Sequence, residues 1–379
     1  MHWQIHDTIH ALPDGLWEQM VARGKCTTSA RFLSALEKTH ADQTHLYFVA
    51  YQPGKAGRGA TEERVVGCAM LVVMRHDLCL EMQAFARRLV GLVRRVWPTF
   101  LTLRLAMTGT LETYGNHYWF DPERLTLEEF VDSLLQQFRA YRRHFRVLVV
   151  RDFIMPEKRS QDAWHFEQAR AVFALHGFHA GDALPVASID ISGFATPEAY
   201  LASLKSRDRY TIRKAIKKGG QSSLASGFEP VSEDLLDECY PLYLAVNQRA
   251  TELVTAPLPR CFFTHVQADF GTTARMYTAR DAAGALVGFG LILETQESME
   301  VFAVGLDYDK LGSVFSMYNL LWECIAEAIR NRRARVDLGV TNTFIKTRFG
   351  AEVAPMKVLY RASNPLLRRL LRSAFSLRA

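Results

Sequence analysis

Four basic side chains follow one another at intervals of four residues. They are Lys205, Arg209, Arg213 and Lys217. On a continuous helix this spacing forms one row about 18 Å long. Like charges four residues apart repel, at a cost of about 0.2–0.5 kcal/mol per pair. Bound phosphates of a cofactor, a tRNA or a lipid head group would offset that repulsion, whereas a solvated basic face is the structural alternative. The row therefore predicts an anion-binding helix face.

A second group of candidate residues lies near the C-terminal end of the chain. Lys346 and Arg348 follow an Asp-x-Gly turn at residues 337–339, on a segment expected to form a short helix. A lysine there can place its charge on a phosphate, or on the oxygen that becomes negative during acyl transfer. A surface lysine beside a turn is the alternative interpretation.

Acyl transfer to an amine also needs a group that removes a proton from the amine. A carboxylate near the centre of a sheet is suited to that task. Glu300, near the start of an expected strand, and Asp337 are the two candidates, and Asp337 could instead orient Lys346. Tyr318, near the start of an expected helix, is a candidate proton donor to a leaving thiolate. A structural role is the alternative for all three residues.

Metal chemistry and the common hydrolase motifs are not indicated. His2, His6 and His10 have a spacing that would make a metal-binding face on a helix, but the alternating Trp3, Ile5 and Ile9 favour a strand. The sequence contains no H-E-x-x-H, no G-x-S-x-G and no P-loop motif. We therefore expect no metal site.

Composition describes an ordinary globular chain. Of the 379 residues, 49% are hydrophobic and 23% charged, which excludes a disordered, collagen-like or coiled-coil protein. The longest apolar runs, 65–74 and 285–293, have about half of the roughly 20 residues that a membrane span requires. Six scattered cysteines without a Cys-x-x-Cys pair, and a start without a basic leader or apolar segment, predict reduced thiols and a cytoplasmic protein. The net charge of +6 permits an anionic substrate or nucleic acid without requiring one.

The elements that would position these residues fall into two series of similar length, with a seam near residue 185. We therefore expect two domains, 1–185 and 186–379, in an α+β fold with mixed layers. In the first, strands are expected at 3–9, 45–51, 65–74, 100–107 and 145–153, and helices at 16–22, 30–37, 125–142 and 161–176. In the second, strands are expected at 185–191, 274–279, 285–295, 298–307, 335–339 and 356–361, and helices at 197–218, 234–251, 259–270, 314–330 and 344–349, with one more at the end.

Two stretches resemble a known family. Residues 210–218 resemble the basic R-x-x-R-K helix of FemAB-like proteins in the GNAT superfamily, and residues 335–352 resemble that family's strand ending in D-x-G followed by K-x-x-x-G. Lys346 and Gly350 occupy the lysine and glycine positions of the second pattern. The resemblance covers about residues 186–361 well and the first half weakly, through residues 31–37.

The resemblance implies two tandem GNAT-like domains, each a mixed central sheet flanked by helices, and transfer of an acyl or aminoacyl group to an amine. It also implies that Lys346 takes part in binding and catalysis and that Glu300 lies where many GNAT enzymes place a glutamate. The donor would be acyl-CoA or aminoacyl-tRNA, used as a co-substrate without a permanently bound cofactor. Residues 310–316 have one glycine where the family's pyrophosphate loop has two, and the long helical hairpin of the tRNA-dependent relatives is not seen.

The expected reaction is direct attack of the amine on the donor carbonyl, with a CoA-type thioester as the expected donor. Acceptor classes left open are a small metabolite, a lipid precursor and a cell-wall peptide. The alternative is a non-catalytic GNAT-fold module that binds nucleic acid or an anionic membrane through the same cations. Residues 363–378 predict a basic amphipathic helix, which would either dock on its own domain or bring the protein to the inner face of the membrane.

Overall fold

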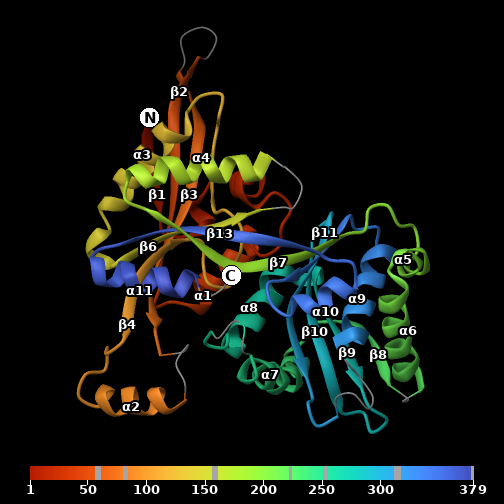
Figure 1. Cartoon of the computed structure of the whole chain (residues 1–379). Helices are drawn as coiled ribbons and strands as arrows, with labels where there is room; N and C mark the ends of the chain where they lie inside the picture. Colours follow the sequence, from red (N-terminus) through yellow and green to blue (C-terminus); the bar gives the residue numbers. More distant parts are fainter. Residues whose placement is uncertain are drawn as a thin grey trace. The chain divides into compact units, whose positions relative to one another are not determined.

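The computed structural model describes residues 1–55, 61–79, 84–155, 161–221, 224–250, 252, 255–310 and 317–376. The chain forms two compact units (Figure 1). Unit 1 comprises Met1–Arg23, Thr27–Leu184 and Pro355–Ala379, and unit 2 comprises Gly24–Cys26 and Pro185–Ala354. The change from unit 1 to unit 2 falls beside the seam expected from the sequence, but the segment after residue 354 returns to unit 1.

Unit 1 is built on a mixed sheet. In spatial order its strands are β1 (His2–His6), β2 (Thr44–Lys55), β3 (Thr61–Asp77), β4 (Thr102–Thr108), β6 (Val147–Ile154) and β13 (Glu352–Ala362), and β5 (Tyr118–Phe120) pairs with β3. The β4–β6 pair is parallel and the other pairs are antiparallel. The last strand of the chain thus completes the sheet of the first unit.

Unit 2 repeats this plan. In spatial order its strands are β7 (His179–Asp190), β12 (Arg335–Gly339), β11 (Ser298–Leu306), β10 (Leu286–Glu294), β9 (Ala274–Arg280) and β8 (Ala225–Pro230). Only the β11–β12 pair is parallel. The pairings from β7 to β8 therefore match those from β13 to β1, one antiparallel, one parallel and three antiparallel. The two units share one sheet topology.

The helices of unit 1 are α1 (Ala30–Thr39), α2 (Ala84–Arg94), α3 (Leu127–Arg139), α4 (Gln161–Leu175) and α11 (Pro365–Ser376). Helix α3 begins with a capping box, in which Thr126 and Glu129 bond each other's backbone N–H groups. Its buried Phe130 and Phe138 pack with Phe173 of α4 against the sheet. A π-helix at Glu18–Ala22 precedes α1.

Helix α11 has contacts within its own unit. Burial lowers the pKa of His179, in the part of β7 that belongs to unit 1, and the positive charges of Arg368 and Arg372 add to this effect. Arg372 also bonds Tyr360 of β13. Leu366, at the start of α11, remains 70% exposed. The helix expected over 363–378 therefore lies beside β13, and residues 377 and 378 fall outside the described residues.

The helices of unit 2 are α5 (Pro197–Ser203), α6 (Ser206–Gln221), α7 (Glu233–Gln248), α8 (Arg260–Phe270), α9 (Met317–Arg330) and α10 (Thr343–Arg348). Helices α5, α6 and α9 cover one face of the sheet, and α7 and α8 lie on the other (Figure 1). On the α9 face the core contains Ile292, Met299 and Val336. Side chains of alternate residues, such as Glu300 and Asp337, therefore face α7 and α8.

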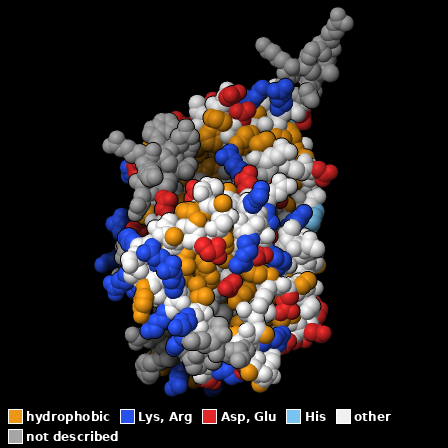
Figure 2. Space-filling model, turned by 90° about the vertical axis from the view of Figure 1, so that its right-hand side faces the viewer, with side chains coloured by type: hydrophobic (Ala, Val, Ile, Leu, Met, Phe, Trp, Pro, Cys, Tyr) orange, Lys and Arg blue, Asp and Glu red, His pale blue; other side chains and the backbone are white. Residues whose placement is uncertain are grey.

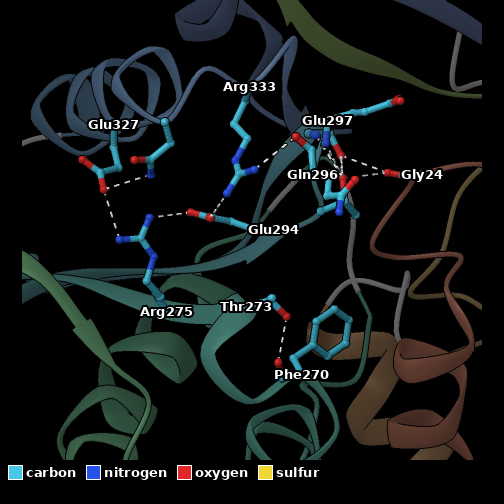
Figure 3. Close-up of polar contacts among 12 residues, drawn as sticks. Gly24, Phe270, Thr273, Arg275, Glu294, Gln296, Glu297, Glu327 and Arg333 are labelled. Atoms are coloured by element: carbon cyan, nitrogen blue, oxygen red, sulfur yellow. Dashed lines mark hydrogen bonds and ion pairs between the residues drawn. The ribbon is translucent and has the colours of Figure 1, made fainter.

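A buried ionic network joins β9, β10 and α9 within unit 2 (Figure 3). Glu294, 8% exposed, accepts hydrogen bonds from Arg275 at 2.5 Å and from Arg333 at 2.9 Å. Arg275 also bonds Glu327 of α9 at 3.0 Å. Each buried carboxylate oxygen of Glu294 thus has its own guanidinium partner, as a buried charge requires.

One expected element is divided in two, because the helix expected over 197–218 breaks between α5 and α6. Leu204 ends α5 in an extended conformation with ψ of 156°. The carbonyl of Lys205 then accepts hydrogen bonds from the N–H groups of Asp208 and Arg209, which starts a new helix. Neither glycine nor proline marks this break, so the pattern of apolar residues alone did not reveal it.

Candidate functional site

The strands β11 and β12 form a very short parallel ladder. Its pairs are Ser298 with Arg335, Met299 with Val336 and Glu300 with Asp337. Strand β11 continues to Leu306, and a bulge beside Val301 shifts its register against β10. Within the part of the chain that the structure describes, β11 and β12 make no further pair beyond Glu300 and Asp337. The two buried carboxylates therefore mark the point where the strands part.

Glu300 has a partner from a distant part of the sequence. Its side chain is 3% exposed, and Oε1 accepts a hydrogen bond of 2.5 Å from the backbone N–H of Cys26. The carbonyl of Gly24, labelled in Figure 3, accepts hydrogen bonds from the hydroxyls of Thr295 and Ser298, each at 3.1 Å. These bonds hold residues 24–26 within unit 2. One oxygen of the expected general base is thus engaged with the backbone.

Asp337 shapes the turn after β12. Its side chain is buried at 3% exposure and accepts a hydrogen bond of 3.2 Å from the N–H of Gly339. Arg335 pairs with its other oxygen at 3.4 Å. Gly339 has φ of +75°, a left-handed conformation that glycine adopts without strain. The D-x-G pattern therefore directs the chain from β12 toward α10.

Lys346 lies buried on the helix that follows this turn. Its exposed fraction is 7%, and burial lowers its pKa to about 8, while the negative charges of Asp337 and Glu252 act in the opposite direction. Glu252 also accepts a hydrogen bond of 2.8 Å from the N–H of Asn342, the residue before α10. A buried lysine of this kind is mostly protonated at neutral pH and still close to its titration. It can supply a positive charge where little water screens it.

Gly350 explains the rest of the K-x-x-x-G pattern. It has φ of +77°, and its N–H bonds the carbonyl of Thr347, while the N–H of Ala351 bonds the carbonyl of Lys346. A Cβ atom at Gly350 would approach Leu204 to 3.1 Å. Glycine is therefore favoured at this helix end both by its backbone conformation and by the close packing of α10 on the α5–α6 junction.

Side chains of α10 connect it to α6 and α9. Arg348 pairs with Asp208 of α6 at 3.4 Å and lies over the ring of Phe344, 4.8 Å from its centroid. The ring of Phe349 lies 5.8 Å from that of Tyr318 in α9. The hydroxyl of Tyr200 donates to the carbonyl of Phe349. The structure thus places Tyr318 beside the C-terminal end of the helix that carries both Lys346 and Arg348.

The four cations of the expected row do not share one helix. Lys205 precedes α6, and the guanidinium of Arg209 donates to the carbonyls of Ala202 at 2.7 Å and of Leu204 at 3.2 Å. Arg209 therefore caps the end of α5. Arg213 and Lys217 remain exposed on α6. Figure 2 shows Lys and Arg side chains gathered on the side of the molecule where α6 lies.

Two features of this site were not expected from the sequence. Glu252 influences the charge of Lys346, and residues 24–26 engage Glu300, but both connections join residues far apart in the chain. No spacing or motif signals either. Residues 311–316 of the expected pyrophosphate loop lie outside the described residues. Among the residues that are described, no cluster of three or more His, Cys, Asp or Glu could hold a metal ion.

Comparisons with known proteins identify a family model and solved structures that this chain resembles. Residues 206–347 match the family described as the acetyltransferase (GNAT) domain. The solved structure of FemX is 11% identical, with 97% of this chain and 99% of FemX covered at a TM-score of 0.59. A conserved protein of unknown function from Bacteroides thetaiotaomicron is also 11% identical, with 95% and 100% covered at a TM-score of 0.51. No curated protein matches the sequence.

The expected α+β fold with two GNAT-like domains is confirmed. The repeated sheet topology gives both units one plan, and the fold similarity to FemX extends over nearly the whole chain. The matched domain contains α6, the diverging strands β11 and β12, and Lys346. Residues 206–347 therefore form an acetyltransferase (GNAT) domain, and the chain as a whole has a fold similar to that of FemX.

Proposed function

We propose that the chain forms an amide by transferring an acyl or aminoacyl group from an activated donor to an amine, with Lys346 as the residue that stabilises the transition state. The observation that carries this proposal is the burial of Lys346, with its lowered pKa, beside the carboxylate where β11 and β12 part. A charge kept in a poorly solvated position is costly for folding, so a purely structural lysine has little reason to be there.

In the proposed reaction, the amine attacks the donor carbonyl directly. The neutral amine forms the C–N bond, the carbonyl oxygen becomes negative, and the Lys346 ammonium stabilises that charge. The carbonyl is restored as the bond to the leaving group breaks, and the proton lost by the amine nitrogen balances the negative charge of the leaving group. Asp337 acts through Lys346, because its negative charge favours the protonated lysine. We assign Glu300 a structural role, since it holds Cys26. Tyr318 remains a candidate proton donor to the leaving group.

The donor proposed is a CoA-type thioester. With Lys205 off the helix and Arg209 engaged as a cap, Arg213 and Lys217 remain as a pair four residues apart on α6. Their spacing along the helix axis is about 6 Å, in place of the 18 Å row. A compact pyrophosphate suits such a pair better than the extended phosphate backbone of a tRNA stem. Arg348 adds less charge, because Asp208 already pairs with it.

The test compares donors on wild-type protein and on Lys346→Ala and Lys346→Arg variants. Acyl-CoA esters and charged tRNA are each supplied with and without ribonuclease, against amine acceptors from three classes, small metabolites, lipid precursors and cell-wall peptides. We expect amide formation from the thioester, its loss in Lys346→Ala, and partial recovery in Lys346→Arg. Full activity of a folded Lys346→Ala variant would remove Lys346 from the mechanism. Activity that requires charged tRNA and is destroyed by ribonuclease would overturn the donor.

A further inference from the structure

Helix α2 of unit 1 and the turn that follows it present several large apolar side chains to solvent. Of the eleven large apolar side chains that are exposed among the described residues, five lie between positions 89 and 97. They are Leu89 (49% exposed), Leu92 (55%), Val93 (41%), Val96 (91%) and Trp97 (59%). Val90, by contrast, is buried at 7%. Scattered exposed leucines are ordinary, but a cluster of this kind marks an interaction surface.

These five side chains form one stripe. Their positions follow the spacing i, i+3, i+4, i+7 and i+8, which places them on a single helix face. The helical path continues past Arg94, because the N–H groups of Val96 and Trp97 both bond the carbonyl of Val93. The stripe is thus the apolar side of an amphipathic helix that points away from its own core.

The fold does not require this helix. In unit 2 the hairpin equivalent to β3–β4 is β10–β11, and residues 295–297 close it. In unit 1 residues 78–101 make the same connection, with α2 inside them. Figure 1 shows α2 below β4, at the end of the strand where β4 begins. The comparison between the two units identifies α2 as an insertion that adds a surface to the GNAT plan.

The residues around the stripe are basic. Arg88 and Arg95 are exposed on α2 and its extension, and Arg75 and Arg104 are exposed register partners on β3 and β4. None of these four side chains has an acidic partner among the described residues. Asp77 is engaged elsewhere, since Arg94 bonds its two oxygens at 2.8 and 2.6 Å. The surface that would cover the stripe must therefore be both apolar and anionic.

We propose that α2 is an interfacial helix that inserts its apolar stripe into a bilayer containing anionic lipids. Exposed leucines and valines with a terminal tryptophan, bordered by arginines, form the pattern of a helix lying at the boundary between head groups and acyl chains. A second copy of the chain fits less well, because a two-fold contact through α2 would bring Arg88 and Arg95 of both copies together.

Local contacts hold α2 in a fixed orientation for this role. Arg94 joins Asp77 at the end of β3 and donates to the carbonyl of Phe100 at 2.9 Å, while Val90 fills the core side of the helix. The ring of Trp97 lies 5.4 Å from that of Phe100, and its indole N–H donates to Thr99 at 3.0 Å. The stripe is therefore presented outward before any membrane arrives, which reduces the entropy lost on binding.

The test is co-sedimentation of the full-length protein with vesicles of phosphatidylcholine alone and of phosphatidylcholine with phosphatidylglycerol. We expect binding to the anionic vesicles that weakens with salt. Leu89→Ser and Leu92→Ser should each reduce binding about tenfold, because each leucine contributes partial apolar burial. Leu366→Ser is the matched control, since Leu366 is an exposed leucine on the other basic amphipathic helix of unit 1. It should bind as wild type does.

Two further measurements keep the proposal falsifiable. Arg88→Gln with Arg95→Gln should reduce binding to anionic vesicles and flatten its salt dependence. The Trp97→Phe variant should lack the blue shift in tryptophan emission that wild type shows on binding. Three outcomes would each overturn the proposal. They are a failure of wild-type protein to sediment with vesicles, equal binding of Leu92→Ser and wild type, and a self-association in solution that Leu92→Ser abolishes. Circular dichroism confirms that each variant is folded.

Discussion

Glu300 and Asp337 occupy the same register position on β11 and β12, and they are the last pair before the two strands part. Their surroundings differ. Glu300 accepts a hydrogen bond from Cys26, whereas Asp337 bonds its own turn and raises the pKa of Lys346 against the effect of burial. Two neighbouring carboxylates thus have separate tasks, one holding a distant segment and one acting on the proposed catalytic lysine.

Replacing Lys346 with methionine should stabilise the protein while abolishing transfer. Burial disfavours the charged lysine, so folding at neutral pH includes a cost that an apolar side chain of similar length avoids. We expect the free energy of unfolding at pH 7 to rise by about 1–3 kcal/mol. Urea unfolding followed by circular dichroism measures it. A destabilised Lys346→Met variant would show that the lysine has structural bonds which compensate its burial.

The lowered pKa of Lys346 also predicts how the free energy of unfolding depends on pH. The pKa of Lys346 is about 8 in the folded protein and its ordinary value is 10.5, so between these values the unfolded chain binds more protons. The contribution of Lys346 to the free energy of unfolding therefore rises between pH 8 and pH 10.5 and is constant below pH 8. The stability difference between Lys346→Met and wild type should shrink from pH 8 to pH 10.5. Unfolding at several pH values gives the comparison.

Activity should fall as pH rises through about 8, because the Lys346 charge that stabilises the oxyanion is lost there. Asp337→Asn removes a negative charge that favours the protonated lysine, so this decline should move to lower pH. Lys346→Arg should move it to higher pH, because arginine stays protonated throughout. Profiles of kcat/KM against pH report these shifts. An activity that rises through the same pH would identify neutral Lys346 as a base.

Two variants of Glu300 distinguish a structural role of this residue from a catalytic one. Glu300→Ala leaves the buried N–H of Cys26 without its acceptor, which should cost about 1–3 kcal/mol of stability. Glu300→Gln keeps an acceptor oxygen, so its stability should stay close to that of wild type and kcat should change by less than about tenfold. Loss of a general base would lower kcat by about 10²–10⁴. A loss that large in Glu300→Gln would restore Glu300 as the base.

Arg209 and Arg213 form a matched pair on α6. Arg209→Ala removes the cap from the α5 carbonyls and should lower the free energy of unfolding by about 1–2 kcal/mol. Arg213→Ala is exposed and should change stability by less than about 0.5 kcal/mol. For donor binding we expect the larger effect from the other variant, since Arg213→Ala should weaken CoA-thioester binding about tenfold. Calorimetry measures both the stability and the affinity for the CoA thioester. Equal donor affinities of Arg213→Ala and wild type would place the donor elsewhere.

Much of the architecture could be predicted because it is encoded locally. Alternating and helical apolar patterns identified β9, β10, β11 and β12, and the D-x-G and K-x-x-x-G patterns located α10. Those patterns have local causes, since Gly339 and Gly350 adopt left-handed conformations at the turn and at the helix end. Such signals depend on neighbouring residues and can be recognised in one sequence.

The parts that were missed depend on tertiary contacts. The break at Leu204 has no glycine or proline, and it is stabilised by Arg209 and by the packing of α10. The row of four cations was therefore wrong as a continuous helix face. The burial of Lys346 and its coupling to Glu252 likewise arise from residues far apart in the chain.

The return of the chain to unit 1 has a consequence for synthesis on the ribosome. Strand β6 pairs with β4 on one side and with β13 on the other, and β13 is translated only after all of unit 2. While unit 2 is being translated, β6 therefore pairs with β4 on one side and still lacks its partner β13 on the other. The strands of unit 2 are made before β13. Unpaired strand edges promote misassembly and aggregation. Residues 356–362 thus act as the late closing strand of a sheet whose other strands are all translated before unit 2.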